Sequence, residues 1–284
     1  MNGNGFTTRT ALLADIHGNS PALEAVLTDI RRCGCRSLVF LGDLINGVDP
    51  GGCVRLLREI GREFELFCVK GNAEAYLLTP DLDHLPGPPE PWTGELIQLI
   101  TWFRARLTTA DLEWIGAFDD YLHWQETILV HDSPLDRLEP QRWHRTGIAA
   151  QYQEWLYHSP GIQVDMAEGR WQDLFDCMNR WRLNQVFCAH THAAFIHRNG
   201  AHLVCNVGSV GAPLDGEPRA AWVMVDESGS VAIQRVEYDV AQTLRLIDQT
   251  DYPDFQRPGY RAAYKKWFST GVHWRVHLRD IGGD

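Results

Sequence analysis

Five short apolar runs in this chain are each followed at once by a side chain that can bind a metal ion. The runs cover residues 11–14, 38–41, 66–69, 127–130 and 185–189. Runs of this length that are rich in β-branched and aromatic residues are typical of strands buried on both faces of a sheet. Ligands of such sheets gather at the carboxyl ends of the strands. We therefore expect one fold to bring all five motifs to a single edge.

The motifs that follow these runs carry carboxylate, amide and imidazole groups. In chain order they are Asp15-Ile16-His17, Gly42-Asp43, Gly71-Asn72, His131 and His190-Thr191-His192. A two-metal hydrolytic centre needs a bridging carboxylate, neutral imidazoles and a hard oxygen ligand, with the ions roughly 3.5–4 Å apart. Asp15 and His17 are two residues apart in a turn after a strand, so both can point at one ion. The chain is therefore predicted to be a metalloenzyme.

Length and charge limit the classes of function. The 284 residues, 44% of them hydrophobic and 22% charged, are enough for a full globular core. The formal net charge of −11 opposes binding to long nucleic acid or to an anionic membrane surface. A two-metal centre reverses the field locally, so small anionic substrates remain compatible with this charge. The sequence makes no prediction of the oligomeric state.

The sequence has no feature of membrane insertion or export. Every apolar run is too short to span a bilayer, and residues 1–8 lack the basic and apolar regions of a secretion signal. The seven cysteines are scattered, and most lie in apolar contexts where a thiol behaves as a small hydrophobic group. We expect reduced thiols and a cytoplasmic location.

Helix and strand patterns alternate in the first half and give way to hairpins in the second. Ser20 is predicted to cap a helix that has Pro21 at its first position. An apolar face predicts a helix near residues 168–182. The dipeptide Asn199-Gly200 between two strand-like runs predicts a type I′ hairpin.

The predicted organisation is a single domain with two additions. We expect one domain over residues 1–284, with a cap-like insert at about 135–184 and a helical C-terminal extension at about 240–284. The insert begins just after His131 and ends just before the run that leads to His190, so both of its ends lie at the metal edge. Its aromatic residues Trp143 and Trp155 are expected to help select the substrate, although a role in core packing is the alternative.

As a set, the motifs resemble those of the calcineurin-like metallophosphoesterase superfamily. The pattern of that family is Asp-x-His, Gly-Asp, Gly-Asn-His-(Asp/Glu), a lone His and Gly-His-x-His in the same order, and the resemblance runs from about residue 10 to residue 240. It implies an α+β fold, a four-layer α/β/β/α sandwich of two mixed sheets. It also implies two divalent metal ions, with Asp15, His17, Asp43 and His192 on the first. Asp43, Asn72, His131 and His190 would hold the second, so that Asp43 bridges.

Longer phrases narrow the resemblance to a branch. Residues 15–24, 206–209 and 215–219 are similar to the small bacterial and archaeal phosphodiesterases near the diadenosine-tetraphosphatase-like proteins. This implies hydrolysis of phosphodiester bonds in a small phosphorylated, nucleotide-like substrate by a hydroxide that bridges the metals. The alternatives are hydrolysis of the pyrophosphate bond in diadenosine polyphosphates, or a metal-binding scaffold with weak catalysis. Manganese is the favoured metal, and iron, zinc, cobalt or nickel suit the same ligands.

Departures from the family pattern affect the expected catalytic residues. Ala73 stands where many members have a histidine thought to protonate the leaving group, which handicaps poor leaving groups. Asp132 follows His131 where the branch often has glycine, and it is expected to support a metal ligand or to act as a substitute acid. With Asp43 and His131, the predicted catalytic set includes Arg219, which either clamps a phosphate or forms a surface ion pair.

Four further residues near the motifs each have two interpretations. Asn19 and Ser20 begin a helix whose amides either meet a phosphate or are simply capped. The hydroxyl of Ser209 either supports one of the histidines of the last motif or belongs to a turn. Glu74 either supports the metal ligands or adds a charge at the start of a helix.

Overall fold

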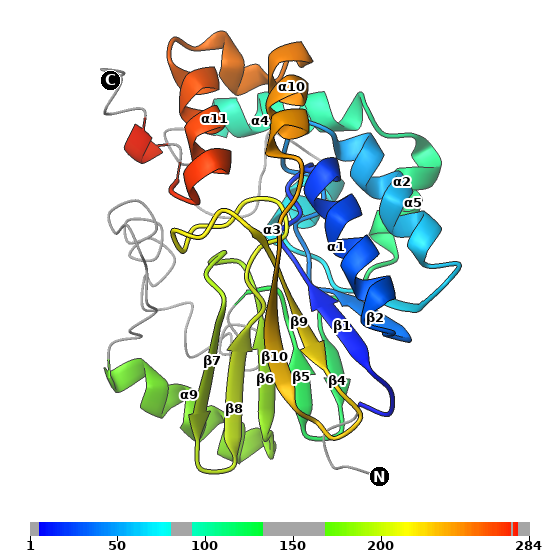
Figure 1. The fold of residues 1–284 in the computed structure, drawn as a ribbon, viewed down its shortest axis with the longest axis vertical. Helices are drawn as coiled ribbons and strands as arrows, with labels where there is room; N and C mark the ends of the chain where they lie inside the picture. Colours follow the sequence, from blue (N-terminus) through cyan, green and yellow to red (C-terminus); the bar gives the residue numbers. More distant parts are fainter. Residues whose placement is uncertain (1–5, 81–92, 133–167, 274, 278–284) are drawn as a thin grey trace.

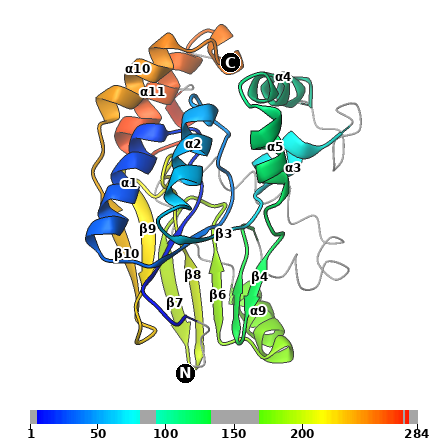
Figure 2. The same cartoon turned by 90° about the vertical axis from the view of Figure 1, so that its right-hand side faces the viewer.

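The computed structural model describes residues 6–80, 93–132, 168–273 and 275–277. Two five-stranded mixed sheets lie face to face in it, with helices on their outer faces (Figures 1 and 2). The residues 133–167, which include Trp143, Trp155 and most of the predicted insert, lie outside the described part.

The first sheet has the strand order β10-β9-β1-β2-β3. Its strands are β1 (Thr10–Leu13), β2 (Ser37–Phe40), β3 (Glu65–Cys68), β9 (Ala220–Val225) and β10 (Val231–Val236). The first three run parallel to one another, and β9 and β10 pair antiparallel at the β1 edge. Parallel pairing of β1, β2 and β3 brings the carboxyl ends of these strands to one edge.

Both faces of the central strands are buried, which explains their unbroken apolar runs. Side chains alternate between the two faces of a strand. Leu13 and Leu38 accordingly pack under the helices, whereas Leu12 and Val39 pack against the second sheet. The prediction of strands buried on both faces is confirmed for β1 and β2.

The second sheet has the order β4-β5-β6-β8-β7. Its strands are β4 (Leu122–Trp124), β5 (Thr127–Leu129), β6 (Gln185–Cys188), β7 (Phe195–Asn199) and β8 (His202–Asn206). The core between the sheets joins Leu129 and Phe187 of this sheet to Leu12 and Val223 of the other. The two sheets are thus held face to face by a shared apolar core.

Helices complete the outer layers. The second sheet is covered by α9 (Glu168–Trp181), whose Leu174, Phe175 and Met178 pack on Ile128 and Val186. The core on the outer side of the first sheet takes in residues of α1 (Ser20–Arg32), α2 (Pro50–Ile60), α3 (Asn72–Leu78), α4 (Thr93–Arg104), α5 (Thr109–Gly116), α10 (Val240–Gln249), the 3₁₀ turn η3 (Pro253–Gln256) and α11 (Tyr260–Thr270). Of these, α4, α10 and α11 lie at one end of the sandwich (Figure 1). The predicted four-layer α/β/β/α sandwich and the helix near 168–182 are confirmed.

Two local predictions are wrong in detail. The helix α1 begins at Ser20, and its cap is Asn19, whose Oδ1 accepts a hydrogen bond from the amide of Ala22 (3.3 Å). The hairpin of β7 and β8 turns through Gly200 and residue 201, because Asn199 pairs with His202. Of these turn residues only Gly200 has a positive φ (58°), as in a type II′ turn and not a type I′ turn.

No helix in the described ranges has both the length and the apolar character that a bilayer span requires. The C-terminal helices α10 and α11 lie at the end of the sandwich toward which β1 and β2 point (Figures 1 and 2). This placement puts them at the same end as the loops that follow those strands.

Candidate metal centre

The five motifs meet at one edge of the sandwich. Each begins within two residues of the end of β1, β2, β5 or β6, or within three of the end of β3. The amide of His190 donates to Asp15 Oδ2 (2.9 Å), which joins the edge of the second sheet to that of the first. Two groups of ligand atoms result, Asp15 with His17 and His192, and Asp43 with His131 and His190.

The backbone at this edge is strained. Among the described residues, seven that are not glycine have a positive φ, and five of them are predicted metal ligands. These five are Asp15 (51°), His17 (47°), Asp43 (61°), His190 (68°) and His192 (59°). The left-handed region is unfavourable for side chains with a Cβ, and it persists only where the surroundings fix it. The strain is thus concentrated where ligand side chains must be turned toward a common point.

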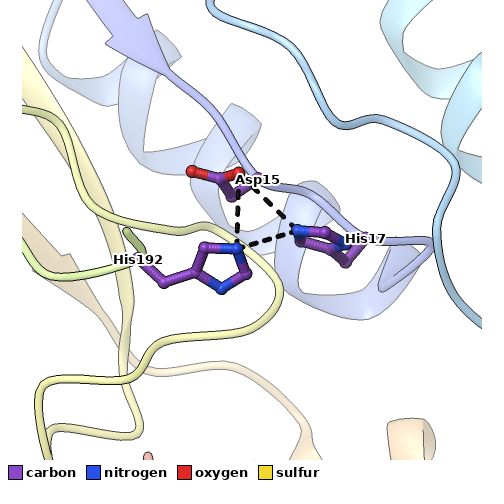
Figure 3. A group of neighbouring side chains, drawn as sticks. All are labelled: Asp15, His17 and His192. Atoms are coloured by element: carbon purple, nitrogen blue, oxygen red, sulfur yellow. Dashed lines mark hydrogen bonds and ion pairs between the residues drawn. The ribbon is translucent and has the colours of Figure 1, made fainter. Parts of the chain in front are cut away.

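The first group is formed by Asp15, His17 and His192, all three buried (Figure 3). The Nε2 atoms of His17 and His192 are 3.0 Å apart. Asp15 Oδ1 lies 3.6 Å from the first of these nitrogens and 3.4 Å from the second. Three potential ligand atoms therefore converge from two sheets.

Backbone carbonyls determine which ring nitrogens carry protons in this group. His17 Nδ1 is 3.1 Å from the carbonyl oxygen of Asn46, and His192 Nδ1 is 2.5 Å from that of Ala212. A carbonyl only accepts, so both Nδ1 atoms donate and both neutral rings present the Nε2 lone pair.

Facing lone pairs repel unless a positive charge lies between them, and Asp15 Oδ1, the third atom, is a buried oxygen without a hydrogen-bond partner among the described residues. Two imidazole nitrogens and a carboxylate oxygen are a donor set that suits a divalent transition metal. The residues present therefore fit a metal ion at this position.

The second group repeats the arrangement. His131 Nδ1 lies 2.6 Å from the carbonyl oxygen of Leu41, so its Nε2 also faces inward. That nitrogen lies 3.1 Å from Asn72 Oδ1 and 3.2 Å from His190 Nδ1. These atoms suit a second ion by the same reasoning.

Asp43 stands between the groups. Its Oδ2 is 3.6 Å from His17 Nε2, and its Oδ1 is 3.5 Å from His131 Nε2. The Oδ1 atom also accepts a hydrogen bond from the amide of Ala73 (2.8 Å), which fixes the carboxylate. One oxygen of a single carboxylate thus faces each group.

The imidazoles differ in proton affinity. Burial lowers the pKa of His192 to about 4 against the opposing charge of Asp15, and burial together with His131 lowers the pKa of His190. Burial also acts on His131, but Asp43 and Asp15 outweigh it and raise the pKa of His131 to about 9. The carboxylates raise the pKa of His17 in the same way, so each group contains one imidazole that attracts a proton and one that favours its neutral form.

Glu74 has a clear structural part. It is fully buried, and its Oε2 accepts from the amides of Asp43 and Gly71 (2.8 Å each). Its Oε1 accepts from the amide of Leu44 (2.8 Å). One carboxylate thus ties the Gly-Asp motif to the Gly-Asn motif. This agrees with the first interpretation of Glu74, support for the metal ligands.

Two polar residues at and after the end of β8 hold the motifs through the backbone. Asn206 Nδ2 donates to the carbonyl oxygen of Ala189 (2.7 Å) and to Thr191 Oγ1 (3.0 Å). Ser209 Oγ donates to the carbonyl oxygen of Asp15 (2.6 Å) and accepts from the amide of Ala212 (2.8 Å). Ser209 therefore bonds backbone groups, and no hydrogen bond in the described structure joins its hydroxyl to an imidazole.

The structure also places the remaining predicted residues. Arg219 donates from Nε and Nη2 to Glu217 (2.9 and 2.8 Å) with 44% of its side chain exposed, which is the ion-pair alternative. A role as phosphate clamp stays a prediction. Asp132 is half-buried, and its charge favours the protonated forms of His131 and His190. Asn19 caps α1 and donates from Nδ2 to the carbonyl oxygen of Gly211 (2.9 Å).

Comparison with known proteins identifies the family. The model of the calcineurin-like phosphoesterase superfamily domain matches residues 9–229. The chain belongs to the calcineurin-like phosphoesterase superfamily. As a member of it, with two groups of candidate ligands, the protein is a metal-dependent phosphoester hydrolase. The resemblance inferred from the motifs is confirmed.

Individual relatives of this calcineurin-like phosphoesterase match it over most of its length and of their own. An uncharacterized protein of Methanocaldococcus jannaschii is 26% identical over 267 residues, which cover 86% of this chain and 94% of that protein. A metallophosphoesterase from Sphaerobacter thermophilus has a TM-score of 0.63 at 21% identity, covering 94% of this chain and 100% of its own. A hypothetical protein from Pyrococcus horikoshii OT3 has a TM-score of 0.70 at 17% identity, covering 94% and 99%. At these identities the solved structures establish the fold.

The Glu74→Gln variant tests the link between the two motifs in this phosphoesterase. Glutamine has one carbonyl oxygen, so its amide group would face at least one of the backbone N–H donors of Asp43, Leu44 and Gly71. We expect the free energy of unfolding to fall by about 1–3 kcal/mol, the usual cost of a buried donor left unsatisfied. Urea denaturation measures this. Glu63→Gln, which removes an exposed partner of Arg31, is the matched control and should change the free energy of unfolding much less. Equal losses in both variants would contradict the role of Glu74.

Proposed function

We propose that this phosphoesterase hydrolyses phosphodiester bonds of a small, nucleotide-like substrate at a centre of two divalent ions. Asp15, His17, Asp43 and His192 hold the first ion, and Asp43, Asn72, His131 and His190 hold the second. Manganese is the first choice because mixed carboxylate, amide and imidazole ligands accept it readily. When bound, such a pair of ions supplies a nucleophile from water at neutral pH and positive charge against the phosphate oxygens.

The observation that carries the proposal is the position of Asp43. A carboxylate whose Oδ2 faces His17 and whose Oδ1 faces His131 can serve two ions at once. In the neutral rings of His17, His192 and His131, hydrogen bonds to the carbonyls of Asn46, Ala212 and Leu41 place the proton on Nδ1 and leave the inward Nε2 as the ligand atom. These residues therefore orient the centre, and the strained backbone of the ligands holds it ready for a phosphate group.

The identity of position 73 supports a substrate with a good leaving group. Ala73 is buried, and its side chain has no proton to donate. Its backbone amide donates a hydrogen bond to Asp43 Oδ1. General acid help is typically worth 10²–10⁴-fold, so esters of simple alcohols are handicapped at a site without it. The same observation favours a second candidate, the pyrophosphate bond of diadenosine polyphosphates, whose leaving group is itself a phosphate. Retention of all seven predicted ligands speaks against an inactive scaffold.

The direct test is turnover of a bis-aryl phosphodiester with added manganese, beside an aryl phosphomonoester and a diadenosine polyphosphate. We expect the diester to be hydrolysed with a higher kcat/KM than the monoester. Preference for the diadenosine compound would select the second candidate. No turnover of any of the three would overturn the proposal in favour of a scaffold.

The Asp43→Asn variant tests the shared carboxylate. Its amide oxygen can still accept from Ala73, so its NH₂ group would face His17 and remove one ligand atom. We expect turnover to fall by more than about 100-fold, beyond the range for partners that merely orient a ligand, and the affinity of both ions to fall. Elemental analysis and assay of the manganese-loaded protein measure the two effects. Asp226→Asn, the same change in the β9–β10 turn, is the control. Full metal content with unchanged turnover in Asp43→Asn would refute the bridge.

A series of aryl diesters tests the role of position 73. Without a general acid, the logarithm of the rate should fall steeply as the pKa of the leaving group rises. Ala73→His should flatten that dependence in a variant whose thermal midpoint shows that it is folded. A shallow dependence in the native enzyme would show that another group already donates the proton, and Asp132→Asn would then be the variant to measure.

A further inference from the structure

The C-terminal segment after β10 contacts the loop that orients the first ligand group. The matched family domain ends at residue 229, so α10, η3 and α11 lie beyond it. Both views place α10 and α11 at the end of the sandwich that carries the motifs (Figures 1 and 2). The loop concerned is residues 210–217, which we call the carbonyl loop because its Ala212 carbonyl accepts from His192 Nδ1.

Helix α11 holds the carbonyl loop through an indole. Trp267 is buried, and its Nε1 donates to the carbonyl oxygen of Pro213 (2.9 Å), the residue after Ala212. The next residue, Leu214, donates its amide to the carbonyl oxygen of His192 (3.2 Å). His192 is thus hydrogen-bonded to Ala212 and to Leu214, the residues on either side of the Pro213 that Trp267 holds.

The end of α11 makes a second contact with the same loop. Gly271, which ends the helix with φ 67°, accepts a hydrogen bond from the amide of Gly216 (3.2 Å). A Cβ on Gly271 would lie 2.8 Å from the backbone nitrogen of Glu217, closer than such atoms normally approach. The backbone of the helix end is therefore fitted against the backbone of the loop.

Helix α10 supports the start of the loop by way of Asn19. The buried Thr243 donates from Oγ1 to Asn19 Oδ1 (2.8 Å), and Asn19 Nδ2 donates to the carbonyl oxygen of Gly211 (2.9 Å). The carbonyl loop is consequently held at its beginning, middle and end by residues that follow β10 or that bond to them.

The second ligand group has a different support. His131 Nδ1 bonds the carbonyl oxygen of Leu41, which directly follows β2 and is buried between the sheets. Among the described residues, no hydrogen bond joins Leu41 or His131 to α10 or α11. The C-terminal helices therefore help to orient His192 through the carbonyl loop, whereas His131 is oriented by the residue that follows β2.

We propose that Trp267 is a positioning residue for the first metal site. Through the carbonyl loop, α11 sets the direction of the His192 imidazole and thereby the affinity of the first ion, while the orientation of His131 at the second ion does not depend on α11. This inference rests on the two-ion centre of the proposed function. It assigns a role in metal binding to a segment outside the matched family domain.

The variant Trp267→Phe keeps an aromatic ring in place and removes the N–H donor. Isothermal titration with manganese alone should show one of two binding sites weakened on the order of tenfold, the lower end of the effect of partners that orient metal ligands. Electron paramagnetic resonance should show isolated manganese replacing the spin-coupled pair at limiting metal. Trp222→Phe is the matched control, because Trp222 is fully buried in β9 and its Nε1 donates to Asp29 Oδ2 of α1 (3.1 Å), which is not hydrogen-bonded to a ligand in the described structure.

A double-mutant comparison assigns the weakened site. With the second site removed by His131→Ala, Trp267→Phe should still weaken the remaining ion about tenfold. With the first site removed by His192→Ala, the same change should have no effect on the ion that is left. Gly271→Ala is a second variant, for use if Trp267→Phe does not fold. Its added Cβ would press on the backbone of Glu217 in the carbonyl loop, so it should weaken the same metal site.

The outcomes separate this inference from the function it rests on. If the native protein binds two ions and both affinities survive in Trp267→Phe and Gly271→Ala, the inference is overturned and the proposed function stands. Equal weakening in Trp222→Phe and Trp267→Phe would also overturn it, because general loss of stability would then be the cause. Fewer than two ions on the native protein would remove the two-ion centre and the inference together.

Discussion

The repulsion between acceptor atoms that face one another in a buried space is the constraint on which this structure depends. Nε2 of His17 and Nε2 of His192 lie 3.0 Å apart, beside a carboxylate oxygen of Asp15 that has no hydrogen-bond partner among the described residues. Burial makes such an arrangement costly unless positive charge enters it. The arrangement persists because the Nδ1 atom of each imidazole donates to a backbone carbonyl, which turns the Nε2 lone pair inward, and the fold fixes the positions of those carbonyls.

The ligands are held by backbone groups more than by one another. Glu74 gathers three amides, Asn206 holds the carbonyl before His190, and Ser209 joins the carbonyl of Asp15 to the amide of Ala212. These bonds over-determine the positions where five ligands have a positive φ. Strained conformations persist only under such support, which is why polar residues with no ligand role are buried around the centre.

The sequence could predict those parts of this arrangement that depend on the type and spacing of side chains. The apolar runs before Asp15, Asp43 and His131 predicted strands that end at one edge, and the order of the motifs predicted the sandwich. The cap of α1 is Asn19 and not the predicted Ser20, and the hairpin turn is of another type than Asn199-Gly200 predicts, because neighbouring polar residues suit both positions. The partners of Glu74 and Trp267 are backbone amides and carbonyls, which every residue carries, so no pattern in the sequence distinguishes them.

The two ligand groups differ in what supports them, and this has a consequence for how the site can vary. His131 rests on the carbonyl of Leu41, directly after β2, a strand that is buried on both faces, so its position cannot change without a change in the core. His17 and His192 rest on the carbonyls of Asn46 and Ala212, which lie in loops outside the sheets. Loops tolerate substitution and insertion better than core strands do. Differences in metal affinity and substrate among proteins with this core are therefore expected to arise at the first group, where loops and C-terminal helices meet, while the second group stays fixed by the packing of the two sheets.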